Sequence, residues 1–385
     1  MKAIALLLGA VLLAGAVPNH VQTADYYAGY AGTKVVAPAS AARWLTWAET
    51  DVAGARSLEP YGVKAILYTN PYRIIPTEPM YTDDESTFAH DCGGKRIETV
   101  GGHANQYLMD PGSAKMRELW RNYVAEHVKE ARFAAVFADD AAGDVYVSGH
   151  PCNYDTKSWL DAVNGLQRAI GFPVIYNALA DYQGHGISKE IALNSSAMGG
   201  MLEECYSQLQ PDTRATGWRW WADERTELAM AAAHKYFFCY GRDLTPADQA
   251  IQSRIYTYAS FLLTYDPRTS VLWEYYQTPT HAHVMPETQL VAYNPVRRIT
   301  QVGQLRAPGG LFVREYRDCY LRGRRIGACA AAVNSDDDAH QFTLRGYRRT
   351  LVLHGSGVFD GGTADANGPA PPSTVAPGSA VIAFR

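Results

Sequence analysis

The sequence predicts an α/β protein, a (β/α)8 TIM barrel followed by a small C-terminal antiparallel β-sandwich domain. From residue 44 to about residue 280, eight short apolar runs alternate with amphipathic helical patterns, which is the count for such a barrel. Beyond residue 300 the runs are strand-like, with turn residues and no helical pattern between them. A doubly wound open sheet is the main alternative, but no GxGxxG turn follows the first predicted strand at Trp47.

Residues 1–24 are predicted to be a secretory signal peptide. A positive charge near the start precedes an apolar core at 3–17, and a small-residue cleavage signal ends at Ala16, with a second candidate cut after Ala24. The apolar core is short for a membrane span, although an uncleaved anchor is the alternative, and no other segment could cross a bilayer. We therefore expect a secreted or periplasmic protein with no membrane span in the mature chain.

The barrel is expected to occupy residues 25–299. Apolar residues recur at helical spacing over 115–131 and 157–170, and a third helix opens at Thr245-Pro246. The strands expected between the helices are 44–47, 63–68, 107–109, 133–138, 173–176, 200–202, 236–240 and 271–273.

The second domain is expected over residues 300–385. Its strand-like runs are GLFVREYRDCYLRGRRIGACAAAVNS, QFTLRGYRRTLVLHG and SAVIAFR. The connecting residues, NPVRRITQVGQLRAPGG, lack the long Gly/Ser or Pro tract of a free linker, so we expect this domain to pack against the barrel.

Six cysteines in an exported chain can pair into three disulfides, and no CxxC or other zinc-site spacing is present. One pair has the spacing of a hairpin staple, and a second lies in two long loops rich in Gly, His and Asp. The third pair is the remainder and falls near the ends of apolar runs. In that order, the expected disulfides are Cys319–Cys329, Cys92–Cys152 and Cys205–Cys239.

The composition disfavours several classes of function. The net charge is −4, and basic clusters are no longer than pairs such as Arg348-Arg349, whereas nucleic-acid binding needs a concentrated basic footprint. His90, His103, His281 and His283 complete no metal-ligand set of known spacing. The GxSxG elbow of an α/β-hydrolase esterase is also missing. We expect no cofactor, no metal and no nucleic-acid partner.

Polar residues at strand ends indicate where the chemistry lies, because the active site of a barrel forms at the carboxyl ends of its strands. Side chains alternate along a strand, so an inward Phe137 implies an inward Asp139, with Asp140 facing away. The same alternation pairs Met201 with Glu203. Asp139 and Glu203 are therefore expected to share one cavity as catalytic residues. The expected substrate-binding residues are Asp140, Trp47, Tyr68, Asn70, Asn177, Glu204, Trp220, Tyr240 and Glu274.

Two carboxyl groups in different environments are the minimum apparatus for cleaving a glycosidic bond. One stays ionised and attacks or stabilises the oxocarbenium-like centre, while the other stays protonated and assists the leaving group. The small residues Ala141, Ala142 and Gly143 leave space for a sugar above Asp139. GWRWWADE places three Trp in a predicted loop after the sixth strand, and one of them is expected to be an exposed sugar platform. For any single acid or Trp taken alone, capping or packing is the simpler interpretation.

Several of these motifs resemble a known group. AAVFADDAAG and GGMLEE are similar to the "gVfLDD" and "gvmvE" strands of the uncharacterised glycoside-hydrolase-like barrel families of the glycosyl hydrolase-like family 15 type. Those families are distant relatives of the α-galactosidase and endo-α-polygalactosaminidase barrels. MDPGSAKMRELW, YASFLLTYDPRTSVLWEY and the tail strands resemble further elements of the pattern, whereas CYLRGRRIGACAAAVN inserts a stapled turn where the pattern is compact. The resemblance implies a retaining glycosidase with Asp139 as nucleophile and Glu203 as acid/base.

The sequence thus predicts a secreted two-domain glycoside hydrolase whose partner is a carbohydrate substrate, an extracellular polysaccharide or glycan. The alternative is a non-catalytic carbohydrate-binding protein on a degenerate barrel. Such a protein needs the aromatic residues but not an inward Asp and Glu within bond-cleaving distance. Metal-dependent hydrolysis is a third hypothesis, which requires His and Asp residues that converge on one ion.

Overall fold

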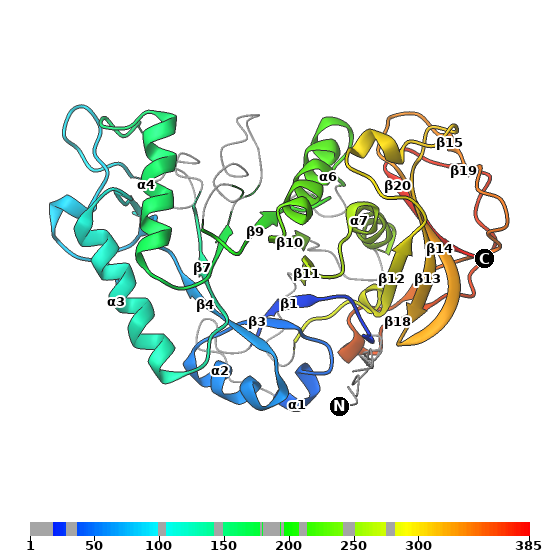
Figure 1. Ribbon diagram of the computed structural model, residues 1–385, viewed down its shortest axis with the longest axis horizontal. Coiled ribbons are helices and arrows are strands. Elements are labelled where there is room, and N and C mark those ends of the chain that lie inside the picture. Colours follow the sequence, from blue (N-terminus) through cyan, green and yellow to red (C-terminus); the bar gives the residue numbers. More distant parts are fainter. Residues whose placement is uncertain are drawn as a thin grey trace, which may run out of the picture.

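The structure is a computed structural model of the chain. It describes residues 18–27, 37–98, 105–141, 149–177, 179, 193, 196–207, 214–241, 251–274 and 282–385. Its architecture is the predicted one, a closed parallel barrel wrapped by helices and followed by antiparallel sheets (Figure 1).

Eight parallel strands form the barrel in the order β1-β11-β10-β9-β8-β7-β4-β3. β1 pairs with both β11 and β3, which closes the ring. The strands are β1 (Thr23–Tyr26), β3 (Trp47–Glu49), β4 (Lys64–Thr69), β7 (Ala135–Ala138), β8 (Val174–Asn177), β9 (Gly199–Glu203), β10 (Tyr236–Gly241) and β11 (Ser270–Glu274).

One predicted barrel strand is wrong. Residues 107–109 contribute to β6 (Tyr107–Leu108), which pairs with β5 (Arg73–Ile74) in a separate two-stranded sheet. The apolar run is real, because Leu108 and Met109 are fully buried. It pairs with β5 rather than with a strand of the barrel wall, and the hydrophobic pattern alone does not distinguish these two places.

The barrel strand absent from the sequence-based prediction is β1, which begins inside the predicted signal peptide. Thr23 and Ala24 pair with β11, and a cut after Ala24 would divide the strand. Cleavage after Ala16 would leave it whole. Residues 1–17, the larger part of the predicted signal peptide, lie outside the described residues.

The helices begin where side chains cap them. Ser113 accepts a hydrogen bond from the Met116 N–H at the start of α3, and Asp155 forms a capping box with Ser158 at the start of α4. The predicted opening of α7 at residues 245–246 lies outside the described residues. The helices are α1 (Pro38–Ala41), α2 (Val52–Leu58), α3 (Ala114–Glu130), α4 (Thr156–Ala169), α6 (Gly217–Ala232) and α7 (Ile251–Thr264), with short 3-10 turns η1 (Glu59–Tyr61), η2 (Glu85–Thr87), η4 (Pro286–Gln289), η5 (Val302–Leu305) and η6 (Val358–Asp360).

Alternate residues of the strands fill the barrel interior. Phe137 and Met201 belong to one buried cluster with Trp47, Phe238 and Trp273, so their predicted inward direction is confirmed. Side chains on one face of a strand recur every two residues. Asp139 and Glu203, two positions after Phe137 and Met201, therefore point into the same interior at the carboxyl ends of the strands.

The C-terminal part of the chain forms a five-stranded antiparallel sheet in the order β12-β13-β14-β20-β16, accompanied by the pairs β15-β19 and β17-β18. The sheet begins at residue 290, before the predicted boundary at residue 300. Its strands and those of the pairs are β12 (Leu290–Pro295), β13 (Phe312–Leu321), β14 (Arg324–Asn334), β15 (His340–Gln341), β16 (Arg349–Thr350), β17 (Val352–His354), β18 (Thr363–Asp365), β19 (Thr374–Val375) and β20 (Ser379–Phe384).

Helix α7 lies between the barrel and this sheet (Figure 1). Tyr316 and Arg314 of β13 donate hydrogen bonds to backbone carbonyls near the end of α7. Arg254 of α7 forms a buried bidentate ion pair with Glu287, at 2.9 and 2.5 Å. The sheet therefore packs against the barrel, as the linker composition predicted.

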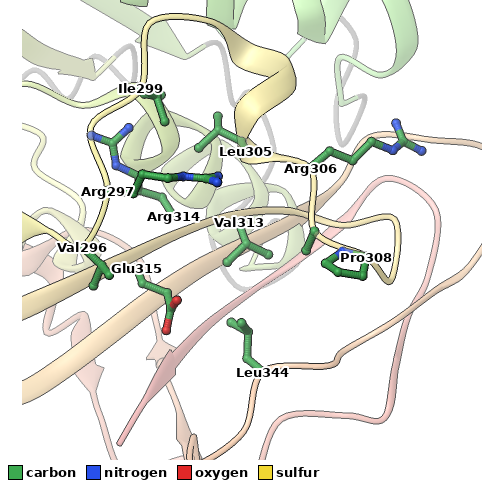
Figure 2. Close-up of a pocket in the computed structure, with 11 residues that line it drawn as sticks. Val296, Arg297, Ile299, Leu305, Arg306, Pro308, Val313, Arg314, Glu315 and Leu344 are labelled. Carbon is green, nitrogen blue, oxygen red and sulfur yellow. The ribbon is translucent and has the colours of Figure 1, made fainter.

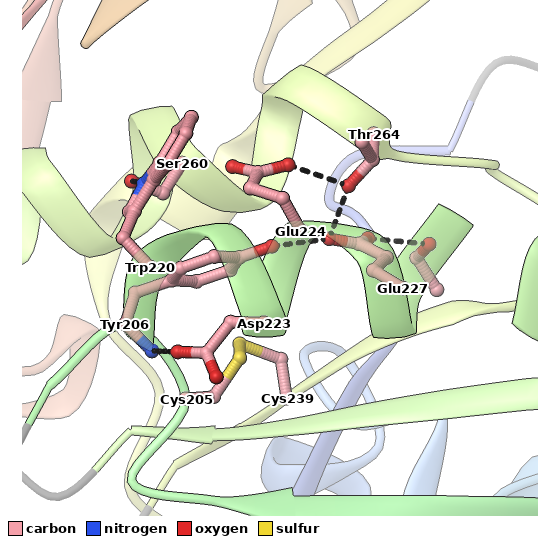
Figure 3. The surroundings of a disulfide bond; sticks show 10 residues. Cys205, Tyr206, Trp220, Asp223, Glu224, Glu227, Cys239, Ser260 and Thr264 are labelled. Carbon is pink, nitrogen blue, oxygen red and sulfur yellow. Dashed lines mark hydrogen bonds between the residues drawn. A yellow bond between two sulfur atoms is a disulfide. The ribbon is translucent and has the colours of Figure 1, made fainter. Parts of the chain in front are cut away.

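Three disulfides join the cysteines in the predicted pairs, Cys92–Cys152, Cys205–Cys239 and Cys319–Cys329. The bridge Cys205–Cys239 connects β10 to the segment that follows β9. It lies beside three acidic residues of α6 (Figure 3), and all three are buried: Asp223, Glu224 and Glu227.

Burial raises the pKa of each acid in this α6 cluster, to about 7 for Asp223 and about 8 for Glu227. The carboxylate of Glu227 accepts hydrogen bonds from the hydroxyl groups of Tyr206, Thr264 and Ser270.

Candidate active site

The carboxyl ends of three adjacent strands bring together the central predicted residues. Asp139 directly follows β7, while Asn177 and Glu203 are the last residues of β8 and β9. These strands are neighbours in the barrel order, so their final inward side chains meet at one side of the barrel mouth.

The amide of Asn177 connects the two acids. Its Nδ2 donates to Oδ1 of Asp139 at 2.5 Å and to Oε1 of Glu203 at 2.9 Å. The two oxygens therefore cannot lie further apart than the sum of 2.5 and 2.9 Å. Asp139 and Glu203, which the sequence predicts to face one cavity, are thus connected by hydrogen bonds to the side chain of Asn177.

Asp139 is surrounded by hydrogen-bond donors. Besides Asn177, the Tyr68 hydroxyl donates to Oδ2 at 2.7 Å and the backbone N–H of Asp140 donates to Oδ1 at 2.9 Å. Burial, with the nearby charges of Asp140 and Glu203, nevertheless raises the pKa of Asp139 to about 7, although the bonds from Asn177 and Tyr68 oppose the shift. Burial among other acids therefore favours the protonated form of Asp139 more than exposure to water would.

Asp140 and Glu204, which follow Asp139 and Glu203 directly in the chain, each form an ion pair with an arginine. Asp140 forms an ion pair with Arg73 at 3.2 Å and accepts a hydrogen bond from Asn70 at 2.7 Å. Glu204 is buried and forms an ion pair with Arg219.

The backbone explains how neighbouring acids face opposite ways. Asp140 and Glu204 have φ values of 53° and 56°, in the left-handed region that few residues other than glycine adopt. The chain therefore turns sharply directly after Asp139 and after Glu203. The predicted substrate-binding residues Asp140, Asn70 and Glu204 lie in this supporting layer.

Two residues of the mouth are not among the predicted catalytic or substrate-binding residues, although Glu49 is one of the polar residues that end a predicted strand. Glu49 ends β3 two positions after the inward Trp47; it is fully buried, and neither carboxyl oxygen has a hydrogen-bond partner in the described structure. Burial and the charge of Asp139 raise its pKa well above the ordinary range. Tyr26 ends β1, and its pKa is raised by burial and by the charges of neighbours that include Glu49 and Asp139. The alternation that singles out Asp139 would also have identified Glu49.

The aromatic residues are distributed differently from the prediction. GWRWWADE forms the start of helix α6 rather than a loop. Trp220 is fully buried and donates to the Ser260 hydroxyl, so it cannot be a sugar platform, whereas Trp218 is 64% exposed. Trp47 is buried inside the barrel, with the Lys64 ammonium 4.4 Å from the centre of its ring. Tyr240 is buried and pairs in register with Glu203 at the mouth.

The remaining predicted site residue, Glu274, ends β11, but its side chain lies outside the described residues. Within the described part of the chain, no group of three His, Cys, Asp or Glu side chains is arranged to hold a metal ion. No helix in that part is long and apolar enough to span a membrane.

Comparison with known proteins gives one family match. The model of the family described as hypothetical glycosyl hydrolase family 15 matches residues 68–318. No curated protein matches the chain.

Among solved structures, the chain is similar to Aspergillus fumigatus Ega3 in complex with galactosamine, with 11% identity, a TM-score of 0.42, and coverage of 67% of this chain and 92% of that one. It is similar to the glycoside hydrolase domain of PelA from Pseudomonas aeruginosa, with 13% identity, a TM-score of 0.44, and coverage of 68% and 96%. It is also similar to the xylanase Xyn30A from Clostridium acetobutylicum, with 8% identity, a TM-score of 0.46, and coverage of 95% and 97%.

Proposed function

Because the chain belongs to hypothetical glycosyl hydrolase family 15, we propose that it hydrolyses glycosidic bonds of an extracellular polysaccharide or glycan, with Asp139 and Glu203 as its catalytic carboxyl groups. The observation that carries the proposal is the Asn177 amide, which bonds to both carboxyl groups at the carboxyl ends of the barrel strands. The three disulfides support the proposal that the protein functions in an oxidising compartment outside the cytoplasm.

The separation of the two acids favours retention of anomeric configuration. Carboxyl groups stand about 5–5.5 Å apart in retaining enzymes and about 6.5–9.5 Å apart in inverting ones, which must fit a water between acid and sugar. The shared hydrogen bonds of Asn177 limit the nearest Asp139 and Glu203 oxygens to about 5.4 Å. This short separation supports the retaining mechanism.

In the proposed first step, an Asp139 oxygen attacks the anomeric carbon, the bond from that carbon to the glycosidic oxygen breaks, and Glu203 gives its proton to the departing oxygen. In the second step, Glu203 takes a proton from water, whose oxygen displaces Asp139 from the anomeric carbon. The free sugar and the starting protonation states result.

The hydrogen bonds support this assignment of roles. Asp139 accepts from three donors, and two of them, an amide N–H and a backbone N–H, cannot accept a proton in return. Such donors stabilise the ionised form that a nucleophile needs. When Glu203 carries the proton, one of the charges that raise the pKa of Asp139 is removed. Trp218, exposed near the start of α6, is then the candidate platform for the sugar.

The test begins with purified protein on a panel of polysaccharides and aryl glycosides. On the substrate found, Asp139→Asn and Glu203→Gln are each expected to abolish turnover without a change in the thermal midpoint. Azide should rescue an Asp139→Gly variant with an inverted product and a Glu203→Gly variant with a retained one. Glycan binding without hydrolysis across the panel would instead favour the non-catalytic binding protein.

A further inference from the structure

A groove lies on the outer surface of the barrel, at its junction with the five-stranded sheet. The larger part has a volume of about 1100 Å³ and lies between α6, the residues after α7, and the segment 298–303. A smaller part of about 330 Å³ lies between residues 296–299, residues 305–308, Leu344 and β13 (Figure 2). Ile299 and Arg314 line both parts, so the two meet there. We call the two together the arginine groove.

Part of the arginine groove lies at the opposite end of the barrel strands from the mouth. His234 and Arg268 line it, and they directly precede β10 and β11, so they lie at the amino ends of these strands. Asp139 and Glu203 lie at the carboxyl ends of their strands. A ligand in the groove would therefore occupy a different surface from a substrate at the mouth.

The groove carries a positive charge that its neighbours only partly neutralise. Of its two acidic lining residues, Asp266 pairs with Arg268 and Glu315 pairs with Arg385, outside the groove. Arg306 also pairs with Asp336, which lies outside the groove. Among the described residues, Arg225 and Arg298 form no ion pair, and both are exposed. The arginines of the groove are Arg225, Arg268, Arg297, Arg298, Arg306 and Arg314. The whole chain has a net charge of −4, so this concentration is local.

Arg314 contributes a second, independent observation. Only 8% of its surface is exposed, and its guanidinium donates to the Leu263 carbonyl at 3.1 Å. Its Nε is buried and has no hydrogen-bond partner in the described structure. Buried guanidinium groups are normally fully bonded, so Arg314 is unusual in keeping an unbonded N–H beside the groove. Against the effect of burial, which raises the pKa of Glu224 and Glu227 on α6, the charge of Arg314 lowers the pKa of both. Figure 2 shows its side chain in the lining with Arg297.

We propose that the arginine groove binds an acidic glycan chain, one that carries carboxylate or sulfate groups. The planar fork of a guanidinium matches a carboxylate or sulfate through paired N–H donors, which an ammonium cannot do. The cations are spread along two connected cavities rather than gathered at one point, which suits a chain of spaced anions better than a single small ion. Trp221 in the lining adds an aromatic surface of the kind that contacts sugar rings.

This inference goes beyond the proposed hydrolysis and does not depend on it. A glycan bound in the arginine groove would keep the polymer near the protein, whether or not it is hydrolysed at the mouth. The binding test therefore uses the full chain carrying Asp139→Asn and Glu203→Gln, so that no turnover can change the ligand.

Titration calorimetry with a short oligogalacturonate, a sulfated galacto-oligosaccharide and an uncharged galacto-oligosaccharide tests the proposal. We expect one or both acidic probes to bind, the uncharged probe not to bind, and the affinity to fall as salt rises. The variant Arg225→Ala/Arg298→Ala should lose roughly tenfold in affinity, because each exposed charge contact is a modest contribution. Which acidic probe binds more tightly distinguishes carboxylate from sulfate recognition.

The matched control is Arg324→Ala/Arg348→Ala, which removes two exposed arginines outside the groove and should keep full affinity. Equal losses in both double variants would reduce the effect to net charge and overturn the proposal. Equal binding of the uncharged probe, or tighter binding of a DNA oligonucleotide, would overturn it as well. If restoring Asp139 and Glu203 is required for binding, the ligand occupies the mouth instead. Hydrolysis is not measured here, so a failure of the catalytic proposal would leave these outcomes unchanged.

Discussion

At the scale of single residues, two adjacent carboxyl groups have different surroundings. Asp139 faces Asn177 and Tyr68 inside the mouth. Asp140 instead pairs with Arg73 of β5, whose side chain is 3% exposed. The left-handed backbone at Asp140 separates the two directions. The two acids should therefore respond differently to the same substitution.

We expect Asp140→Asn to lower the free energy of unfolding by about 1–3 kcal/mol, because it removes the negative charge that lies 3.2 Å from the buried Arg73 guanidinium. Activity should fall less than in Asp139→Asn. Urea unfolding and hydrolysis rates measure the two effects, and Asp140→Asn/Arg73→Met should recover part of the lost stability. An inactive Asp140→Asn of unchanged stability would mean that the neighbour, not Asp139, is the nucleophile.

Replacing the buried Glu49 with an apolar residue is expected to stabilise the protein, which is unusual for a buried position. Its buried carboxyl group has no hydrogen-bond partner in the described structure, so Glu49→Met should raise the free energy of unfolding, by about 1–3 kcal/mol. Glu227→Met is the matched control, because it removes a buried carboxyl that accepts three hydrogen bonds and should destabilise the protein. Urea unfolding of both variants at pH 7 measures this; a loss of stability in Glu49→Met would contradict it.

At the scale of elements, helix α6 places buried acids against the barrel wall. Asp223 and Glu227 have pKa values raised to about 7 and about 8 in the folded protein, from ordinary values of 3.8 and 4.5. A raised pKa means that the folded state binds protons more tightly than the unfolded state does. Stability is therefore fully present below the ordinary pKa values and is lost as pH rises through the folded ones.

We expect the free energy of unfolding to fall between pH 5 and pH 8, with Asp25 and Asp139 contributing in the same direction because their pKa values are raised to about 8 and about 7. Urea unfolding across this range is the measurement. Glu227→Gln, which cannot ionise, should flatten the profile without abolishing it. Stability that is constant or rises over this range would show that the α6 acids are ionised in the folded state.

At the scale of the whole molecule, the barrel and the five-stranded sheet share helix α7. Tyr316 and Arg314 bond to its last turn, and the buried pair of Arg254 with Glu287 anchors its first turn. The buried hydrogen bonds from β13 to the end of α7 should couple the stability of the two units. We expect a single cooperative unfolding transition for the chain.

Arg254→Ala should destabilise the protein by about 3–5 kcal/mol, because it leaves Glu287 charged and buried without a partner. Arg254→Met/Glu287→Met, which removes both charges, should lie close to the natural chain. Unfolding followed by tryptophan fluorescence and by circular dichroism tests both points. Two separate transitions would show that the units unfold independently. An Arg254→Ala variant with an unchanged free energy of unfolding would contradict the role given to the ion pair.

Much of the fold could be predicted from local patterns. The alternation of strand-like and helical periods indicates the barrel, because periodicity reports which face of an element is buried. The same two-residue period directs Asp139 and Glu203 inward. Spacing and loop context indicate the disulfides Cys319–Cys329 and Cys92–Cys152, and Cys205–Cys239 follows as the remaining pair. These properties depend on neighbours along the chain, so the sequence by itself determines them.

Only the tertiary structure decided properties that depend on distant partners. β1 is a barrel strand because β11 and β3 bind it on both sides, and its four residues carry no distinctive pattern. Trp218 is exposed and Trp220 buried because α7 covers one face of α6. The arginine groove draws its cations from α6, from the turn after α7 and from the segment before β13, and no single stretch of sequence is strongly basic. Burial and charge density arise where separate segments meet, and that meeting is a property of the folded chain.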